Sequence, residues 1–277
     1  MITKRLFVVS LLTLTIVASA FLVSAPSGYA QAEQGWSVPV NLSISGAATN
    51  PAMVIDSRET IHAIWMDDVD AGYKYSSSPD GATWSQPLSV QFPFGPKEPS
   101  PVLLPGPNRS IHVFWLDKDK RLFYGQATPG DLPYSQNWIL VYRLADSVES
   151  YNVSMDAQRA LHVAYIQSSV VDDKPAGVYY TQSPSGGGFW IESRLLYQSE
   201  YFRSATQNDL YLRVSASNTS NNQRVYVTWD NRAQKRVFMA TSVDSGLTWR
   251  DARQIKGPED TGGFDTPFNL TVSALGR

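Results

Sequence analysis

Acidic and basic side chains gather in the polar segments that separate the β-rich phrases of this chain. Asp67 and Asp117 each lie two residues after a tryptophan that ends such a phrase, and Asp230 follows its tryptophan directly. Carboxylates and arginines that converge on one concavity could bind a cation or a polar sugar. The same carboxylates could instead cap the turns in which they lie. The candidate ligand-binding residues are Asp67, Asp68, Asp117, Asp230, Arg232, Glu200, Tyr201 and Arg203.

These polar segments recur because most of the chain is repetitive. The phrases IHAIW, IHVFW, LHVAY and VYVTW occupy residues 61–65, 111–115, 161–165 and 225–229. Each repeat divides into four short strands, which we expect at 51–55, 60–65, 73–77 and 83–90 in the first one. Four-stranded units repeated at this spacing are typical of the blades of a β-propeller. The sequence therefore predicts an all-β propeller of about four complete blades.

A tight turn that leads into a tryptophan is the second recurring feature. It reads SPDGATW at 78–84 and SVDSGLTW at 242–249, with a weaker copy, SPSGGGFW, at 183–190. Asp244 can accept hydrogen bonds from backbone N–H groups of such a turn, and Gly246 can adopt the positive φ that the reversal needs. Trp249 would then pack beside the hairpin.

The pattern S-x-D-x-G-x-T-W resembles the Asp-box, or BNR repeat, of sialidases and related propellers. The resemblance covers residues 33–277 and implies a sialidase-like β-propeller domain. It also implies that the box residues brace the hairpin between the third and fourth strands, on the side opposite the usual propeller site. These structural residues are Ser78, Asp80, Gly81, Thr83, Trp84, Ser242, Asp244, Gly246, Thr248 and Trp249.

The resemblance gives weak support to an enzyme. Sialidases hold the substrate carboxylate with an arginine cluster whose first member lies in an Arg-Ile-Pro phrase, and they use a tyrosine nucleophile, a glutamate and an acid/base aspartate. This chain has no Arg-Ile-Pro phrase, and residues 38–54 contain no arginine. No catalytic residue is therefore assigned. We expect a recognition module for extracellular or cell-surface glycans, or for an exported protein. The alternatives are an exo-sialidase-type glycoside hydrolase with residues missing beyond Arg277, and a structural or assembly propeller.

Three histidines, His62, His112 and His162, recur at the same position of their blades. Equivalent positions on different blades are too far apart to share a metal ion, and the fourth blade carries Tyr226 there. We therefore expect these histidines to have a packing role, and we predict no metal and no cofactor.

The N-terminus predicts export. Lys4 and Arg5 precede an apolar run at 6–25, and Ala30-Gln31-Ala32 offers a small-residue cleavage site. Residues 1–32 are therefore predicted to be a signal peptide, with an uncleaved membrane anchor at 6–25 as the alternative. The chain has no cysteine, which excludes disulfides, and its net charge of -2 gives no reason to expect nucleic acid.

The two ends of the sequence carry single strand patterns. Residues 36–42 resemble a fourth, outermost strand without its blade, and residues 268–277 resemble a first strand without the rest of its blade. A blade without its middle strands cannot pair its backbone groups. We therefore expect 33–277 to be a partial propeller domain, a fragment lacking one or two C-terminal blades.

Overall fold

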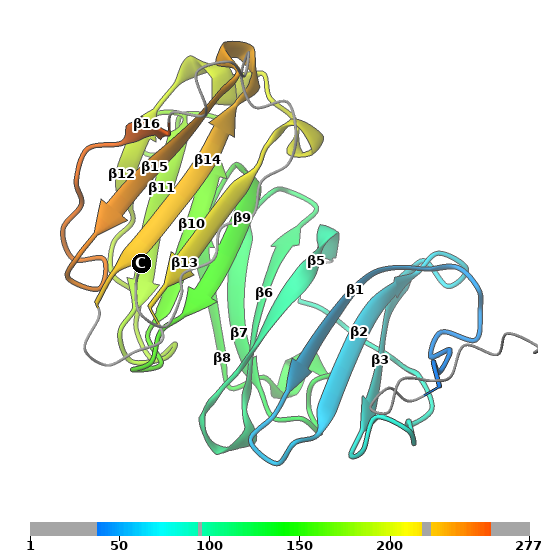
Figure 1. Ribbon diagram of the computed structural model, residues 1–277. Helices are drawn as coiled ribbons and strands as arrows, with labels where there is room; N and C mark the ends of the chain where they lie inside the picture. Colours follow the sequence, from blue (N-terminus) through cyan, green and yellow to red (C-terminus); the bar gives the residue numbers. More distant parts are fainter. Residues whose placement is uncertain (1–37, 94–95, 218–222, 256–277) are drawn as a thin grey trace, which may run out of the picture. The chain divides into compact units, whose positions relative to one another are not determined.

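The computed structural model describes residues 38–93, 96–217 and 223–255, and these form strands, turns and a few short 3-10 helices (Figure 1). All strands of the described residues lie in one compact unit that begins at Asn41. No helix in these ranges is long and apolar enough to cross a membrane.

The described strands form four antiparallel sheets of four strands each, in sequence order (Figure 1). We call them blades 1 to 4 and name the strands of each blade a to d. Blade 1 contains β1 (Ala48–Ile55), β2 (Ile61–Asp67), β3 (Gly72–Ser78) and β4 (Leu88–Ser89). Blade 2 contains β5 (Pro96–Pro105), β6 (Ile111–Asp117), β7 (Leu122–Ala127) and β8 (Leu140–Ala145). Blade 3 contains β9 (Val148–Met155), β10 (Leu161–Gln167), β11 (Gly177–Ser183) and β12 (Arg194–Gln198). Blade 4 contains β13 (Leu212–Ala216), β14 (Val225–Asn231), β15 (Arg236–Ser242) and β16 (Arg253–Ile255).

The hydrophobic core lies between consecutive blades. One cluster joins Ile64 of blade 1 to Trp115 of blade 2. A second joins blades 2 and 3, and a third packs Ile166 of blade 3 near Trp229 of blade 4. Strands β6 and β10 are buried along their whole length because both of their faces meet another blade. The predicted blades are thus confirmed, and each uses its neighbours to bury its sheet.

Innermost strands of neighbouring blades lie side by side, with β1 next to β5 and β9 next to β13. Side chains of β9 supply hydrogen-bond acceptors to the backbone of β13. The Val214 N–H donates to Asn152 Oδ1 at 2.9 Å, and the Ala216 N–H donates to Ser154 Oγ at 3.1 Å. These bonds attach blade 4 to blade 3 without a continuous sheet.

Two predicted strands differ from the structure. Strand d of blade 1 was expected at 83–90 but covers only Leu88–Ser89, because the preceding residues form the turn to Trp84 and Pro87 has no N–H to donate. The extra strand expected at 36–42 is wrong for its described residues 38–42, which are not in a strand. Those residues have no described sheet partner, and an extended segment without a ladder is not a strand.

Two other predictions fall outside the described residues. They are the signal peptide at 1–32 and the additional strand at 268–277.

Candidate functional site

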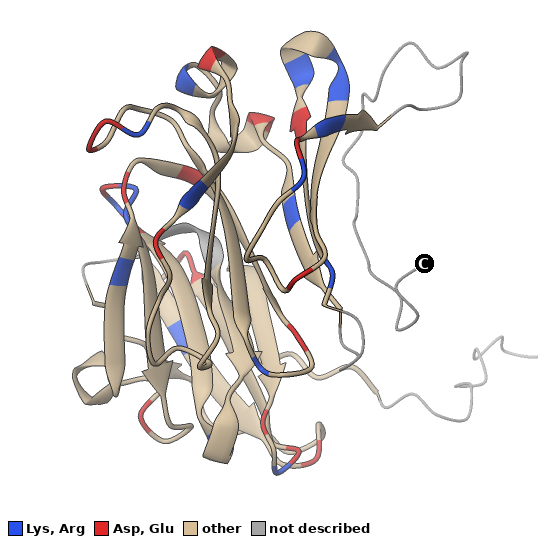
Figure 2. Ribbon diagram, turned by 90° about the vertical axis from the view of Figure 1, so that its left-hand side faces the viewer, with Lys and Arg blue, Asp and Glu red and all other residues tan. Residues whose placement is uncertain are grey.

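The connections of the blades lie at two ends of the strands. The b–c turns and the d–a connections between blades lie at one end, here called the b–c end. The a–b and c–d turns lie at the other, here called the c–d end. Charged side chains of both signs occur mainly in these loops and less along the strands (Figure 2).

The aspartates of the Ser-Asp turns are engaged at the c–d end. Asp244 Oδ1 accepts the Thr248 N–H at 2.8 Å and the Ser242 hydroxyl at 2.7 Å. Burial alone would raise the Asp244 pKa, but hydrogen bonds from Thr248 and Ser242 hold it below its ordinary value. The Trp249 indole N–H donates to the Gly246 carbonyl at 3.0 Å. This carboxylate therefore closes a hairpin and is not offered to a ligand.

The corresponding turn of blade 1 has the same construction. Asp80 Oδ1 accepts the N–H groups of Thr83 at 2.7 Å and Ala82 at 2.9 Å, which lower the Asp80 pKa. The Trp84 indole N–H donates to the Gly81 carbonyl, and the Ser78 hydroxyl accepts the Gly81 N–H at 2.8 Å.

Two of the candidate acids at the b–c end cap their own turns. Asp67 is buried and accepts the N–H groups of Val69 and Asp70, and a hydrogen bond from the Ser45 hydroxyl is the main cause of its lowered pKa. Asp117 is fully buried, accepts the Arg121 N–H at 2.8 Å and pairs with the Arg121 guanidinium.

Asp68, the neighbour of Asp67, is exposed, and its backbone N–H donates to the Ala47 carbonyl at 3.1 Å. None of these three acids lines the polar pocket found at this end of the strands.

A polar pocket opens at the b–c end, where loops of blades 2, 3 and 4 meet. Its volume is about 510 Å³. Lys120 comes from the b–c turn of blade 2, Glu149 from β9, and the rest from the connection between blades 3 and 4. The lining residues are Lys120, Glu149, Arg203, Ser204, Ala205, Thr206, Gln207 and Asn208.

Glu149 is the buried charge of this pocket, with 7% of its surface exposed. The Lys120 ammonium forms an ion pair with its carboxylate. The Ser168 hydroxyl donates to the same carboxylate oxygen at 3.1 Å. A carboxylate buried to this degree needs such partners, because its desolvation is otherwise unfavourable.

Local capping shapes the wall of the pocket. Ser199 is the N-cap of the 3-10 helix Glu200–Arg203, and its hydroxyl accepts the Tyr201 N–H. Phe202 of this helix is fully buried. The 3-10 helix Gln207–Asp209 begins with a reciprocal cap between Thr206 and Asp209. These caps fix the backbone of the connection between blades 3 and 4, although the connection forms no strand.

A second group of charges links this connection to the end of β14 and to the b–c turn of blade 4. Arg232 reaches Asp230 at 3.3 Å and Asp209 at 3.5 Å. Burial raises the Asp230 pKa, although the Tyr211 N–H and Arg232 act in the opposite direction. The Tyr201 hydroxyl donates to the Asp209 carbonyl, and burial raises the Tyr201 pKa.

Five of the candidates predicted from sequence therefore come from this region: Glu200, Tyr201, Arg203, Asp230 and Arg232. Arg203 also pairs with Glu200 at 3.0 Å. Sequence reasoning missed Lys120, Glu149 and Asp209. Nothing in the sequence pairs Lys120 with Glu149 across blades.

The recurring histidines lie inside the blades. Each donates or accepts a hydrogen bond through Nδ1 with a tyrosine hydroxyl of strand c: His62 with Tyr75, His112 with Tyr124, and His162 with Tyr180. Within the described ranges, no group of three or more His, Asp or Glu side chains could hold a metal ion.

Comparison with solved structures gives the class of fold. This chain has the sialidase-like β-propeller fold. A leech intramolecular trans-sialidase, solved with 2,7-anhydro-Neu5Ac, matches with a TM-score of 0.50 and 10% identity, over 80% of this chain and 54% of its own. The Hadza microbial sialidase matches with a TM-score of 0.42 and 14% identity, over 75% of this chain. Aleuria aurantia lectin in complex with α-methyl-L-fucoside matches with a TM-score of 0.46 and 12% identity, over 75% of this chain and 60% of its own.

This chain spans 45% of the length of the Hadza sialidase and 54% of the leech enzyme. No protein-family model and no curated protein sequence matches it. At identities this low, the structural match shows the fold alone. The function has to be argued from the site.

Proposed function

We propose that this chain is an exported carbohydrate-recognition propeller that binds a glycan in the pocket of Lys120, Glu149 and Arg203. The observation that carries the proposal is this polar pocket of about 510 Å³ at the b–c end. Its volume is typical of small-ligand sites, roughly 300–1,000 Å³. It suits one or two sugar residues.

The chemistry of the lining favours a hydroxyl-rich ligand. Lys120 and Arg203 offer charged donors, Glu149 offers an acceptor, and the Gln207 and Asn208 amides can do both. A protein interface would instead be expected to centre on buried aromatic anchors. The leech trans-sialidase holds a sugar derivative on the same fold, which supports the proposal by analogy.

Export rests on the sequence of residues 1–32, with its two cations, apolar run and small-residue cleavage site. Glycans of cell surfaces and of the extracellular space would then be within reach of the protein.

We propose a binding role without catalysis. The Glu149 carboxylate is held by Lys120 and Ser168, and the sequence has no Arg-Ile-Pro phrase. A glycoside hydrolase is the second candidate, and Asp230 favours it, because a carboxyl with a raised pKa suits a general acid.

A glycan array followed by calorimetry with the best glycan tests the proposal. Arg203→Ala should weaken binding about tenfold, since a charge-assisted hydrogen bond is lost. Arg143→Ala is the matched control, because Arg143 is also half-exposed and pairs with an acid three residues away, outside the pocket.

An array without signal would overturn glycan recognition and leave a protein partner as the better explanation. Hydrolysis of fluorogenic glycosides by the chain, abolished by Asp230→Asn, would overturn the non-catalytic role and support the second candidate.

A further inference from the structure

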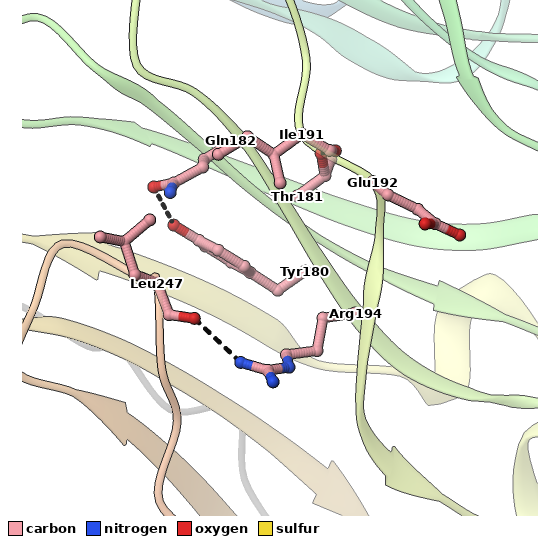
Figure 3. Close-up of a pocket in the computed structure, with 8 residues that line it drawn as sticks. Tyr180, Thr181, Gln182, Ile191, Glu192, Arg194 and Leu247 are labelled. Atoms are coloured by element: carbon pink, nitrogen blue, oxygen red, sulfur yellow. Dashed lines mark hydrogen bonds between the residues drawn. The ribbon is translucent and has the colours of Figure 1, made fainter.

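A second pocket lies at the c–d end, between blades 3 and 4 (Figure 3). Its volume is about 180 Å³. Strand β11 supplies one wall, the segment leading into β12 supplies another, and the Ser-Asp turn of blade 4 closes the third side. The lining residues are Tyr180, Thr181, Gln182, Ile191, Glu192, Arg194, Gly246 and Leu247.

The walls are joined to one another. The Arg194 guanidinium donates to the Leu247 carbonyl at 2.9 Å, which links blade 3 to the turn of blade 4 (Figure 3). The Tyr180 ring packs edge-on against Trp249 at 4.6 Å between centroids. Gly246 has no room for a Cβ atom, which would lie 2.0 Å from the Tyr180 hydroxyl. The pocket is therefore a built feature of the blade junction.

Gln182 is the group in this pocket that points to a ligand. Only 4% of its surface is exposed, and its Oε1 accepts the Tyr180 hydroxyl at 2.9 Å. No described residue accepts a hydrogen bond from its Nε2. This nitrogen is not among the buried side-chain atoms that lack a partner, so it keeps access to the pocket and can donate to an incoming acceptor.

The remaining lining suits an amphipathic ring. Leu247 is 61% exposed and Ile191 37%, so they present apolar surface beside the Tyr180 ring. Glu192 and Arg194 add one acceptor and one donor of opposite charge, which favours a neutral ligand. Sugars combine hydroxyl groups with an apolar C–H face. The volume of this pocket corresponds to about six water molecules at the density of the liquid. It is smaller than the volume of sites for drug-sized ligands, so the pocket suits a single sugar ring.

We propose that this pocket is a second carbohydrate subsite, which takes a single neutral sugar residue through Gln182, Arg194 and Leu247. It lies at the opposite end of the strands from the pocket of Lys120, Glu149 and Arg203. The seven residues of β10 span about 23 Å between these ends. The subsite extends the proposed function to a second position, and it depends on its own contacts alone.

Saturation-transfer NMR with the methyl glycosides of glucose, galactose, mannose and N-acetylglucosamine tests the subsite. The chain carrying Arg203→Ala is used, so that the first pocket is weakened. At least one glycoside should bind with a Kd of about 1 mM, as expected for a ligand of this size. Adding Leu247→Ala should weaken it about fivefold or more, because the apolar wall is lost. Gln182→Met should act in the same direction.

Val243→Ala is the matched control, because Val243 is 48% exposed in the same turn and does not line the pocket. No saturation transfer from any of the four glycosides, or equal signals for Leu247→Ala and Val243→Ala, would overturn the subsite. The proposed function would fail separately, if Arg203→Ala left the array glycan's affinity unchanged.

Discussion

Asp244 and Asp230 are both carboxylates at strand ends of blade 4, yet their surroundings move their pKa values in opposite directions. Asp244 accepts hydrogen bonds from a backbone N–H and two hydroxyls, which stabilise its ionised form. Burial of Asp230 disfavours its ionised form more than its hydrogen bonds favour that form, so its pKa is raised. At the residue scale, the local supply of donors separates a turn brace from a potential functional acid.

Replacing Asp244 should therefore destabilise the fold. Asp244→Ala removes three hydrogen bonds to one carboxylate and should lower the free energy of unfolding by about 1–3 kcal/mol. Because the folded pKa is lowered, this contribution is present above the ordinary aspartate pKa and is lost as the pH falls through the folded value. Urea unfolding measures it. Asp251→Ala, at an exposed position, should cost little, and equal losses for the two variants would contradict the bracing role.

At the element scale, the c–d hairpins of blades 3 and 4 each touch the preceding blade through a tyrosine. The Tyr180 hydroxyl of strand β11 lies under Gly246 of the next blade, and the Tyr124 hydroxyl of strand β7 lies under Gly187. Both glycines also have positive φ. The hairpin is thus a contact between blades as well as a connection within one.

Gly246→Ala should test this contact. The new Cβ would lie 2.0 Å from the Tyr180 hydroxyl oxygen, in addition to the strain of φ +89°. Gly81→Ala is the control, because Gly81 has φ +76° but its Cβ would meet no atom closer than 3.5 Å.

We expect Gly246→Ala to lower the free energy of unfolding by about 1–3 kcal/mol more than Gly81→Ala does, the cost of overpacking. Thermal or urea unfolding measures the difference. Similar losses of stability in the two variants would mean that the positive φ, and not the contact with Tyr180, causes the loss at both turns.

At the scale of the whole described chain, blade 2 differs from blades 1 and 3 in the surroundings of its recurring histidine. Asp156 lies 3.2 Å from Nε2 of His162, and Asp56 lies 3.5 Å from Nε2 of His62. The equivalent residue of blade 2 is Gly106, and Nε2 of His112 is buried without a partner among the described residues. Burial, together with the nearby charge of Arg159, lowers the His112 pKa to about 4.

Stability should therefore depend on pH below neutrality. The folded pKa of His112 is below its ordinary value of about 6.5, so its contribution is complete above pH 6.5 and is lost as the pH falls towards 4. The loss should reach about 3 kcal/mol. Urea midpoints between pH 7 and pH 4 measure it.

His112→Leu should remove most of this slope, whatever its effect on stability at pH 7. His62, whose pKa is also lowered by burial, would account for what is left. An unchanged slope in His112→Leu would assign the pH dependence to other groups.

The blades and their turns could be predicted from the amino-acid sequence alone. A repeated phrase of alternating side chains, and turns whose hydrogen bonds join residues at most four apart, require only local geometry. Asp67, Asp117 and Asp244 could therefore be read as turn residues. The limits of strand d in blade 1 differ from the prediction, because the turn before Leu88–Ser89 shortens that strand.

The positions of the two pockets, in contrast, depend on how the blades pack against one another. Lys120 and Glu149 are 29 residues apart, and Arg194 and Leu247 are 53 residues apart. Only Leu247 lies in a recurring turn, and it occupies one of the variable positions of that turn. Such groups meet because consecutive blades bury their faces against one another, which is a non-local consequence of hydrophobic packing. A period in the sequence reveals that the blades exist, whereas their packing selects which unrepeated side chains share a pocket.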